Sequence, residues 1–434
     1  MPPVKRVLMI AYHFPPMSGS SGIHRTLGFV RDLEAFGWQR MVLTTRPSAY
    51  DQVSDDLMKE VPDTVPVHRA FALDTARHLA LFNRYPLALA LPDRWVSWLA
   101  GAIPTGLRMI RAHKPDVLWS TYPIATAHLI GAALARLTGI PWVADFRDPM
   151  AHEGYPPEPR VWRSYLKVEK RVFARACRIT FTTPGAMRFY CRRYPGAASR
   201  CTVVQNGYDE RSFDGLQDAA SHAAPLNPGR LTLLHSGVVY PAHRSPEHLF
   251  GALRGALDAG LISADRIRVR FRAPVHEQFV HELTAQYGLD GIVELLPAVG
   301  YREALREMIR ADGLIVLQSA DCNDQIPAKV YEYMRAGRPV IGLTDDAGAT
   351  AAVLRDAGLR HIAALDSTSG IQSSLLAFLA EIEAETAPRA SQASVESSSR
   401  RGSARALSEV LDQARKERCS SLSKANGMPT KDRP

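Results

Sequence analysis

Short apolar runs alternate with longer segments of helical periodicity along most of the chain. In the first half the apolar runs lie at residues 7–11, 41–45, 116–120, 142–145 and 179–182. Segments with helical spacing of apolar residues lie between them, at residues 28–36, 125–138 and 161–176. A repeated order of strand and helix is typical of a parallel sheet covered by helices on both faces. The first half therefore predicts one doubly wound α/β domain.

The same alternation starts again after a break at residues 206–209. Residues 214–230 are rich in Ala, Ser, Pro and Asn, a composition typical of a linker. Further apolar runs lie at residues 231–234, 268–271, 293–296, 314–317 and 340–343. We therefore predict an N-terminal Rossmann-like domain at 1–208, a linker at 209–230 and a C-terminal Rossmann-like domain at 231–387.

The end of the chain changes character. Residues 388–403 are Ser-rich and predict a second linker. Residues 404–417 return to helical periodicity and predict a final helix. Residues 418–434 are polar and predict a disordered tail.

Composition places the chain among globular proteins of two or three domains. Its 434 residues are 46% hydrophobic and 22% charged. The net charge of +9 favours anionic partners, such as phosphates, anionic lipid or nucleic acid, without choosing among them. The five cysteines are scattered and lack the spacing of a zinc site, which indicates free thiols in a reducing, cytoplasmic compartment. Apolar residues within 78–110 are interrupted by Arg and Pro, so we expect no membrane span there.

The run at residues 324–343 carries the most chemistry. It predicts a loop, a short helix ended by glycine, and a buried strand. Free N–H groups at the helix N-terminus near Ile326 suit a phosphate. Lys329 and Glu332 share one helix face and could bind phosphate and sugar hydroxyls. At the carboxyl end of a parallel sheet, these groups would fit a nucleotide-sugar pocket.

Two loops of the first half offer further candidates. The first contains Gly19 and Gly22, which allow a ligand to approach the backbone, and leads to Arg25 one turn into a helix. It is not a dinucleotide-binding G-x-G-x-x-G loop. The second carries Asp145, Arg147 and Asp148 at the end of an apolar strand, where charges face the ligand crevice. The alternatives, an ordinary surface loop and an internal Arg–Asp pair, stay open.

The second half repeats this arrangement after its first strand. Gly237 leaves room for a ligand, and Arg244 could reach it as a cation; a solvent-facing Arg244 is the alternative. His235 and His243 lack an evident catalytic partner, so we assign both a structural role.

Residues 160–178 predict a basic helix interleaved with aromatic side chains. Such a helix can lie on an anionic membrane surface, and a solvated surface helix is the alternative. Nothing in the sequence is typical of a nucleic-acid-binding module, so we expect no nucleic-acid partner.

Taken together, these motifs resemble the family-4 glycosyltransferases of the GT-B architecture, in a bacterial branch with an Asp-Phe-Arg-Asp-Pro run. The resemblance covers roughly residues 4–413. It rests on four local matches in the same order: residues 12–16 with Gly19, Gly22 and Arg25; residues 141–149; residues 206–209 with Phe213; and residues 327–340.

The resemblance implies two Rossmann-like domains that face a cleft, the C-terminal one binding a nucleotide-sugar and the N-terminal one the acceptor. It implies transfer with retention of anomeric configuration, without a cofactor or bound metal. The final helix would cross back to the first domain. The branch suggests a glycan or lipid-linked acceptor in cell-surface polysaccharide synthesis. The basic helix at residues 160–178 would place such an enzyme peripherally at the inner face of the plasma membrane.

The resemblance also assigns roles to single residues. Glu332 matches the carboxylate that holds the ribose, and Asp324 the acidic residue that contacts the donor sugar. Arg244 and Lys329 match or neighbour the phosphate-binding cations. Gly19 and Gly22 match the loop that faces donor phosphates and acceptor. Arg147 stands where many members have a His and would keep positive charge near the leaving group.

Besides Arg147, two further features depart from the family pattern. Asp324 replaces a glutamate, and Asn323 and Gln325 stand where the family carries Gly-Phe-Gly. The sequence therefore predicts a retaining glycosyltransferase, with a nucleotide-sugar epimerase of the same architecture or a non-catalytic sugar-nucleotide-binding protein as alternatives.

Overall fold

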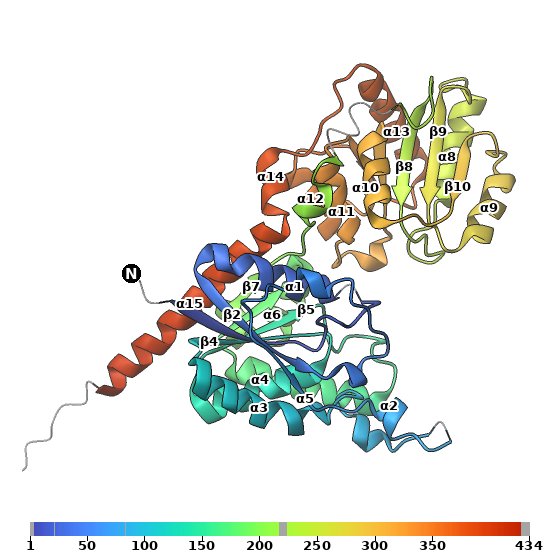
Figure 1. The fold of residues 1–434 in the computed structure, drawn as a ribbon. Helices are drawn as coiled ribbons and strands as arrows, with labels where there is room; N and C mark the ends of the chain where they lie inside the picture. Colours follow the sequence, from blue (N-terminus) through green and yellow to red (C-terminus); the bar gives the residue numbers. More distant parts are fainter. Residues whose placement is uncertain (1–3, 21, 83, 217–223, 427–434) are drawn as a thin grey trace, which may run out of the picture. The chain divides into compact units, whose positions relative to one another are not determined.

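The computed structural model describes residues 4–20, 22–82, 84–216 and 224–426, with the backbone alone for 418–426 (Figure 1). The chain forms two compact units. The N-terminal unit comprises residues 1–206 and 400–434, and the C-terminal unit comprises residues 207–399. Each unit is an α/β domain built on one parallel sheet, which confirms the predicted fold class.

The sheet of the N-terminal unit has seven strands in the order β3-β2-β1-β4-β5-β6-β7, all paired in parallel. The order reverses between β1 and β4, and at such a switch point α/β proteins bind ligands beyond the carboxyl ends of the strands. The strands are β1 (Lys5–Ile10), β2 (Trp38–Thr45), β3 (Val67–Ala70), β4 (Val117–Thr121), β5 (Trp142–Arg147), β6 (Arg178–Phe181) and β7 (Cys201–Val203).

Helices cover both faces of this sheet, so its central strands are apolar at nearly every position. In β1, Leu8 and Ile10 face the core under α3, α4 and α5, whereas Val7 and Met9 face the core under α1 and α15. The helices are α1 (Gly22–Asp32), α2 (Thr75–His78), α3 (Trp98–His113), α4 (Ala125–Thr138), α5 (Pro159–Arg175), α6 (Pro184–Arg193) and α15 (Arg400–Asn426).

The sheet of the C-terminal unit has six parallel strands in the order β10-β9-β8-β11-β12-β13. They are β8 (Leu231–Ser236), β9 (Ile267–Arg272), β10 (Val293–Leu296), β11 (Gly313–Leu317), β12 (Val340–Leu343) and β13 (Ile362–Ala363). One core lies under α8 (Glu247–Asp258), α9 (Glu277–Gln286) and α13 (Thr368–Glu383). The opposite core lies under α10 (Tyr301–Arg310), α11 (Ala328–Ala336) and α12 (Ala349–Asp356).

The segments predicted as linkers and tail are more ordered than the sequence indicates. Residues 388–403 contain α14 (Gln392–Ser397) and the first turn of α15, because Ser391 caps α14 by accepting a hydrogen bond from Ser394 N. The final helix also extends beyond residue 417, to Asn426, where a disordered tail is expected. Within 209–230, Phe213 and Leu216 are buried in the core of the C-terminal unit. Residues 217–223 and 427–434 lie outside the described residues.

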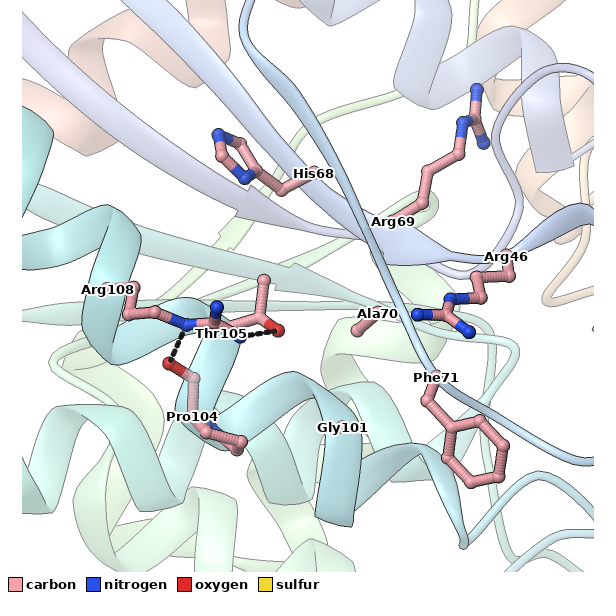
Figure 2. A pocket seen from close by; sticks show the side chains of 9 residues that line it. All are labelled: Arg46, His68, Arg69, Ala70, Phe71, Gly101, Pro104, Thr105 and Arg108. Carbon is pink, nitrogen blue, oxygen red and sulfur yellow. Dashed lines mark hydrogen bonds between the residues drawn. The ribbon is translucent and has the colours of Figure 1, made fainter.

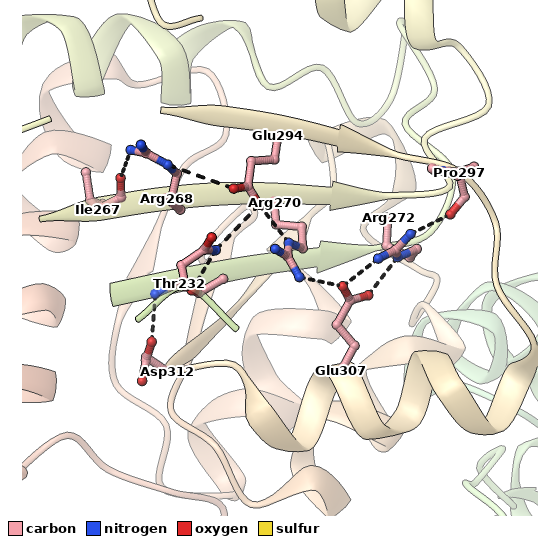
Figure 3. A network of polar contacts seen from close by, with 10 residues as sticks. Thr232, Ile267, Arg268, Arg270, Arg272, Glu294, Pro297, Glu307 and Asp312 are labelled. Atoms are coloured by element: carbon pink, nitrogen blue, oxygen red, sulfur yellow. Dashed lines mark hydrogen bonds and ion pairs between the residues drawn. The ribbon is translucent and has the colours of Figure 1, made fainter. Parts of the chain in front are cut away.

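A charged network ties β9 and β10 to α10 in the C-terminal unit (Figure 3). Arg270 and Arg272 both pair with the buried carboxylate of Glu307, at 2.9 and 2.7 Å, and Arg270 also pairs with Glu294 at 2.8 Å. Burial alone would raise the pKa of Glu307, yet the two arginines hold it below its usual value. Arg272 also donates to Pro297 O at 2.8 Å, which holds the loop after β10 in place.

Close packing around Gly131 of α4 provides a test of the N-terminal core. A Cβ atom there would lie 2.6 Å from Trp142 Nε1 and 3.0 Å from Ser120 Oγ, which hydrogen bond to each other. We expect Gly131→Ala to lower the free energy of unfolding by about 1–3 kcal/mol, because the buried Trp142 must shift. Gly196→Ala is the matched control, since nothing lies within 4 Å of its added Cβ atom. Urea unfolding that ranks the two variants equal would contradict this account.

Candidate functional site

A buried ion pair in the N-terminal unit joins α1 to β5. Arg25 donates from Nε and Nη2 to the two oxygens of Asp145, at 3.0 and 2.8 Å. Its other donors reach Val204 O, Gln205 O and the Asn206 side chain. All five N–H donors of Arg25 are thereby used inside the protein.

The carboxylate of Asp145 likewise has its hydrogen-bond partners inside the protein. Its oxygens also accept hydrogen bonds from Thr121 Oγ1 at 2.9 Å and Thr180 Oγ1 at 2.7 Å. Burial alone would raise the pKa of Asp145, but Arg25 and Thr180 hold it below its usual value. The sequence predicts Arg25 and Asp145 as ligands of a bound phosphate or acceptor. The structure instead gives them the internal Arg–Asp pairing that the sequence leaves open for this loop, with Arg25 rather than Arg147 as the partner.

Arg147 is a cation of this unit that faces the first loop. It ends β5 with a positive φ of 63°, where the register with β6 shifts. A Cβ atom on Gly22 would lie 2.8 Å from Arg147 Nη1 and 2.5 Å from His13 Nδ1, so only glycine permits this approach. Arg147 Nε is buried and has no hydrogen-bond partner among the described residues. Burial, and then the charge of Arg25, lower the pKa of Arg147.

His13 belongs to the same group, although the sequence assigns it no role. Its Nδ1 lies 3.0 Å from Ser20 Oγ, which also accepts from Gly22 N. Burial, and then Arg147, lower the pKa of His13 to about 4, so the ring is neutral near pH 7. Gly22, Arg147 and His13 therefore form one cluster, which we call the first-loop cluster.

Two other predicted residues lie elsewhere in this unit. Gly19 has a φ of 76°, and a Cβ atom there would meet Gln52 Oε1 at 2.7 Å. Asp148 is exposed and accepts from Thr182 Oγ1 at 3.3 Å. The positions of Gly19 and Asp148 do not show whether either residue binds a ligand, so their predicted roles stay predictions.

The C-terminal unit brings Gly237, Lys329 and Glu332 together beyond the carboxyl end of β8. Lys329 Nζ lies 2.9 Å from Glu332 Oε2, and Tyr301 donates to Glu332 Oε1 at 2.8 Å. A Cβ atom on Gly237 would lie 4.0 Å from Lys329. Tyr333 of α11 accepts from Ser236 N at 2.8 Å, which fixes the helix against the strand end. We call Gly237, Tyr301, Lys329 and Glu332 the α11 cluster.

A second cation, Arg244, lies near this cluster. Its guanidinium lies 5.3 Å from the ring centroid of Tyr240 and makes no hydrogen bond or ion pair with a described residue. The buried His235, which places Nδ1 3.0 Å from Ile315 O, responds to both cations. Burial chiefly, with smaller contributions from Arg244 and Lys329, lowers the pKa of His235 to about 4. Positive charge therefore gathers at the end of β8.

The loop before α11 holds the remaining predicted residues. Gln318 donates to Cys322 O and Gln325 O at 2.6 and 3.1 Å, which fixes the loop against β11. Ile326 is half-buried against the core, and Asp324 is exposed. The predicted contact between Asp324 and the donor sugar stays a prediction. Among the described residues, no three His, Cys, Asp or Glu side chains are grouped so that they could hold a metal ion. No described helix is long and apolar enough to cross a membrane.

Comparison with known proteins gives one family match. Residues 22–207, most of the N-terminal unit, match the family model described as a glycosyl transferase 4-like domain. No curated protein matches the sequence.

Solved structures match nearly the whole chain. A glycosyltransferase from Rickettsia africae matches with a TM-score of 0.65 at 10% identity, over 94% of this chain and 98% of its own. Trehalose 6-phosphate synthase from Burkholderia multivorans matches with a TM-score of 0.62 at 13% identity, over 99% and 100%. HepE from Anabaena, in complex with UDP, matches with a TM-score of 0.58 at 13% identity, over 96% and 100%. At these identities the likeness establishes the GT-B fold.

We expect the protein to lose much of its stability when the Arg25–Asp145 pair is broken. Asp145→Ala leaves a buried guanidinium unpaired, so we expect the free energy of unfolding to fall by about 3–5 kcal/mol. Asp148→Ala, an exposed carboxylate in the same loop, should change it by no more than about 0.5 kcal/mol. Thermal and urea unfolding of the two variants measure the difference, and equal stabilities would contradict the assignment.

The same pair sets a pH dependence. The pKa of Asp145 is held below its value of about 3.9 in the unfolded chain. Its contribution to stability is therefore complete above about pH 3.9 and is lost as the pH falls through the folded-state pKa.

Proposed function

We propose that this protein is a retaining glycosyltransferase that takes a sugar from a nucleotide-diphosphate donor and binds the donor through its C-terminal unit. The observation that carries the proposal is the α11 cluster with Arg244 beside it. These residues place two cations and one carboxylate beyond the carboxyl ends of β8 and β11, where the sheet order reverses. The N-terminal match to a glycosyl transferase 4-like domain and the GT-B neighbours support the same class of enzyme.

The chemistry of glycosyl transfer suits these groups. As the glycosidic bond to the diphosphate breaks, negative charge grows on the leaving oxygens. Arg244, Lys329 and the amides at the start of α11 would stabilise that charge. In the free protein, Glu332 already neutralises Lys329 and accepts from Tyr301. A ribose hydroxyl could then donate to Glu332 when the diphosphate contacts Lys329. No step of this scheme uses a metal ion.

Exposed apolar side chains around the same strand ends offer a surface for the nucleobase. Tyr240, Val275, Val299 and Tyr301 are 46%, 66%, 38% and 44% exposed. They belong to the loops after β8, β9 and β10 and to the start of α10. A base covers aromatic and apolar surface of this kind by stacking. HepE, one of the neighbours, has been solved with UDP and with UDP-glucose.

We assign the acceptor to the N-terminal unit, where the first-loop cluster provides its binding groups. Arg147 is held in place by the turn after β5, and its Nε has no partner within the described residues. It is the cation of this unit that we place near the reacting groups. A glycan or lipid-linked acceptor of cell-surface polysaccharide synthesis is the class we propose.

A thermal-shift panel of UDP, GDP, ADP and their sugars tests the donor class. A bound nucleotide raises the melting temperature by mass action, so one base should stand out. Incubation with the matching nucleotide-sugar alone, followed by product analysis, separates transferase from epimerase. An epimerised sugar would overturn the proposal, and so would a protein that no nucleotide stabilises.

Glu332 gives the sharpest single-residue prediction. We expect Glu332→Ala to weaken nucleoside-diphosphate affinity roughly tenfold to hundredfold, because a charged hydrogen-bond acceptor is lost. Glu303→Ala, an exposed carboxylate of α10 paired with Arg306, is the matched control and should bind as the wild type does. Isothermal titration calorimetry provides the measurement. Unchanged affinity in Glu332→Ala would remove the ribose assignment.

We also propose that α5 attaches the enzyme to an anionic membrane surface. Its outer face is exposed and cationic, whereas Glu169, its one acidic residue, is buried and paired with Arg193 at 2.9 Å. The exposed cations are Arg160, Arg163, Lys167, Lys170, Arg171 and Arg175.

Vesicle co-sedimentation tests this attachment. Each cation near an anionic surface contributes about 1 kcal/mol, so removing Arg163 and Lys167 together should weaken binding about thirtyfold. The control replaces Arg111 and Arg136, two exposed arginines outside α5, and keeps the same net charge. Vesicles of phosphatidylcholine, with and without phosphatidylglycerol, provide the comparison. Equal binding by the two double variants would show that α5 has no special role.

A further inference from the structure

A pocket of about 430 Å³ lies in the N-terminal unit, between the edge strand β3 and helix α3 (Figure 2). Neither the α11 cluster nor the first-loop cluster contributes to it. Its position is still at the carboxyl end of the sheet, because Arg46 directly follows β2 and Phe71 directly follows β3. The lining residues are Arg46, His68, Arg69, Ala70, Phe71, Gly101, Pro104, Thr105 and Arg108.

Two guanidinium groups reach into this pocket from different elements. Figure 2 shows Arg46 and Arg108 on opposite sides of Ala70 and Thr105 with their side chains extending toward each other, whereas Arg69 turns the other way. Arg69 is in fact used elsewhere, since it donates to Pro15 O at 2.7 Å. The backbone of Arg46 hydrogen bonds to Ala70 O and Ala49 N, but its guanidinium makes no hydrogen bond or ion pair with any residue that the structure describes. Arg108 makes only weak contacts within its own helix, at 3.4 Å to Pro104 O and 3.3 Å to Thr105 Oγ1.

The charge in the pocket is not balanced. None of the described residues that line it is acidic. His68 adds a third nitrogen-bearing side chain beside Arg108, and burial, then His113 and Arg108, lower its pKa. Cations that converge on one space without a carboxylate leave a positive potential, which an anion would neutralise.

The lining also includes apolar surface, part of it exposed. Phe71 is 45% exposed. Gly101 of α3 approaches the Phe71 backbone so closely that a Cβ atom would lie 2.3 Å from Phe71 O. Figure 2 shows the Phe71 ring on the Arg46 side of the pocket, and Pro104 lies on the adjoining turn of α3. An anionic head and an attached organic body would each find a matching surface.

We propose that this pocket binds the phosphate group of an organic phosphate, with the organic part of that molecule lying on Phe71. Guanidinium groups match phosphate because they offer two parallel donors to its oxygens, and two of them together suit a dianion better than a single-charged carboxylate. The phosphate could belong to a soluble sugar phosphate or to a phospholipid headgroup. The proposal does not depend on the nature of the donor or on catalysis.

Calorimetric titration of the full chain with inorganic phosphate and with glucose 6-phosphate tests the soluble source, with glucose as the uncharged control. Co-sedimentation with phosphatidylcholine vesicles that contain either phosphatidic acid or phosphatidylglycerol, at equal surface charge, tests the lipid source separately from the charge effect expected of α5. We expect at least one phosphate source to bind, and Arg46→Gln and Arg108→Gln each to weaken that binding about tenfold or more, since each removes a charge-assisted contact. Arg136→Gln, an exposed arginine of α4, should leave it unchanged.

The variants are informative because both arginines are exposed and neither pairs with an acidic residue among those that the structure describes, so the fold should tolerate their loss. A Phe71→Ala variant separates the two parts of the ligand. It should weaken glucose 6-phosphate or phosphatidic acid while leaving inorganic phosphate unaffected. The proposal is overturned if no phosphate source binds, or if Arg46→Gln, Arg108→Gln and Arg136→Gln bind equally well.

Discussion

The buried pairing of Arg25 with Asp145 is the interaction on which the N-terminal unit depends. It lies where α1, β5 and the segment at 204–206 converge, and two threonines from β4 and β6 complete it. An unpaired charge there would be costly, so the pair fixes how these elements meet. The pair also fixes where the loop that follows Asp145 begins. Arg147 follows Asp145 by two positions and is turned by its positive φ toward Gly22 and His13.

The C-terminal unit also has to balance the charges of its cations, and it does so in a different way. The two cations of its candidate site are partly exposed: Lys329 is balanced by Glu332, and Arg244 lies over an aromatic ring. Such groups can exchange their partners for a ligand at little cost, whereas Arg25 cannot. In the C-terminal unit, the charged residues proposed to bind the donor are therefore separate from Arg270, Arg272 and Glu307, which pair with one another inside the fold.

The sequence predicts the two parallel sheets well, because buried central strands such as β1 and β11 contain continuous apolar runs. The sequence predicts the edge strands of the sheets less well. Strand β3 is four residues long and contains His68 and Arg69, so it has no apolar signal, and the pocket beside it was not expected. Local sequence patterns also cannot predict contacts between residues that are far apart in the chain. The partner of Asp145 is 120 positions away, and nothing in the periodicity distinguishes Arg25 from Arg147 as that partner. Tyr301, which contacts Glu332 from another helix, was missed for the same reason.

Hydrogen exchange of the full chain with and without the nucleoside diphosphate that stabilises it would test the central claim, that the donor binds at the end of β8 and the start of α11. Peptides spanning residues 237–245 and 328–336 should gain protection, because their backbone amides lie beside Arg244, Lys329 and Glu332. Peptides over the buried strands of both units should remain as they are. Protection confined to the N-terminal unit, or absent from both peptides, would contradict the account.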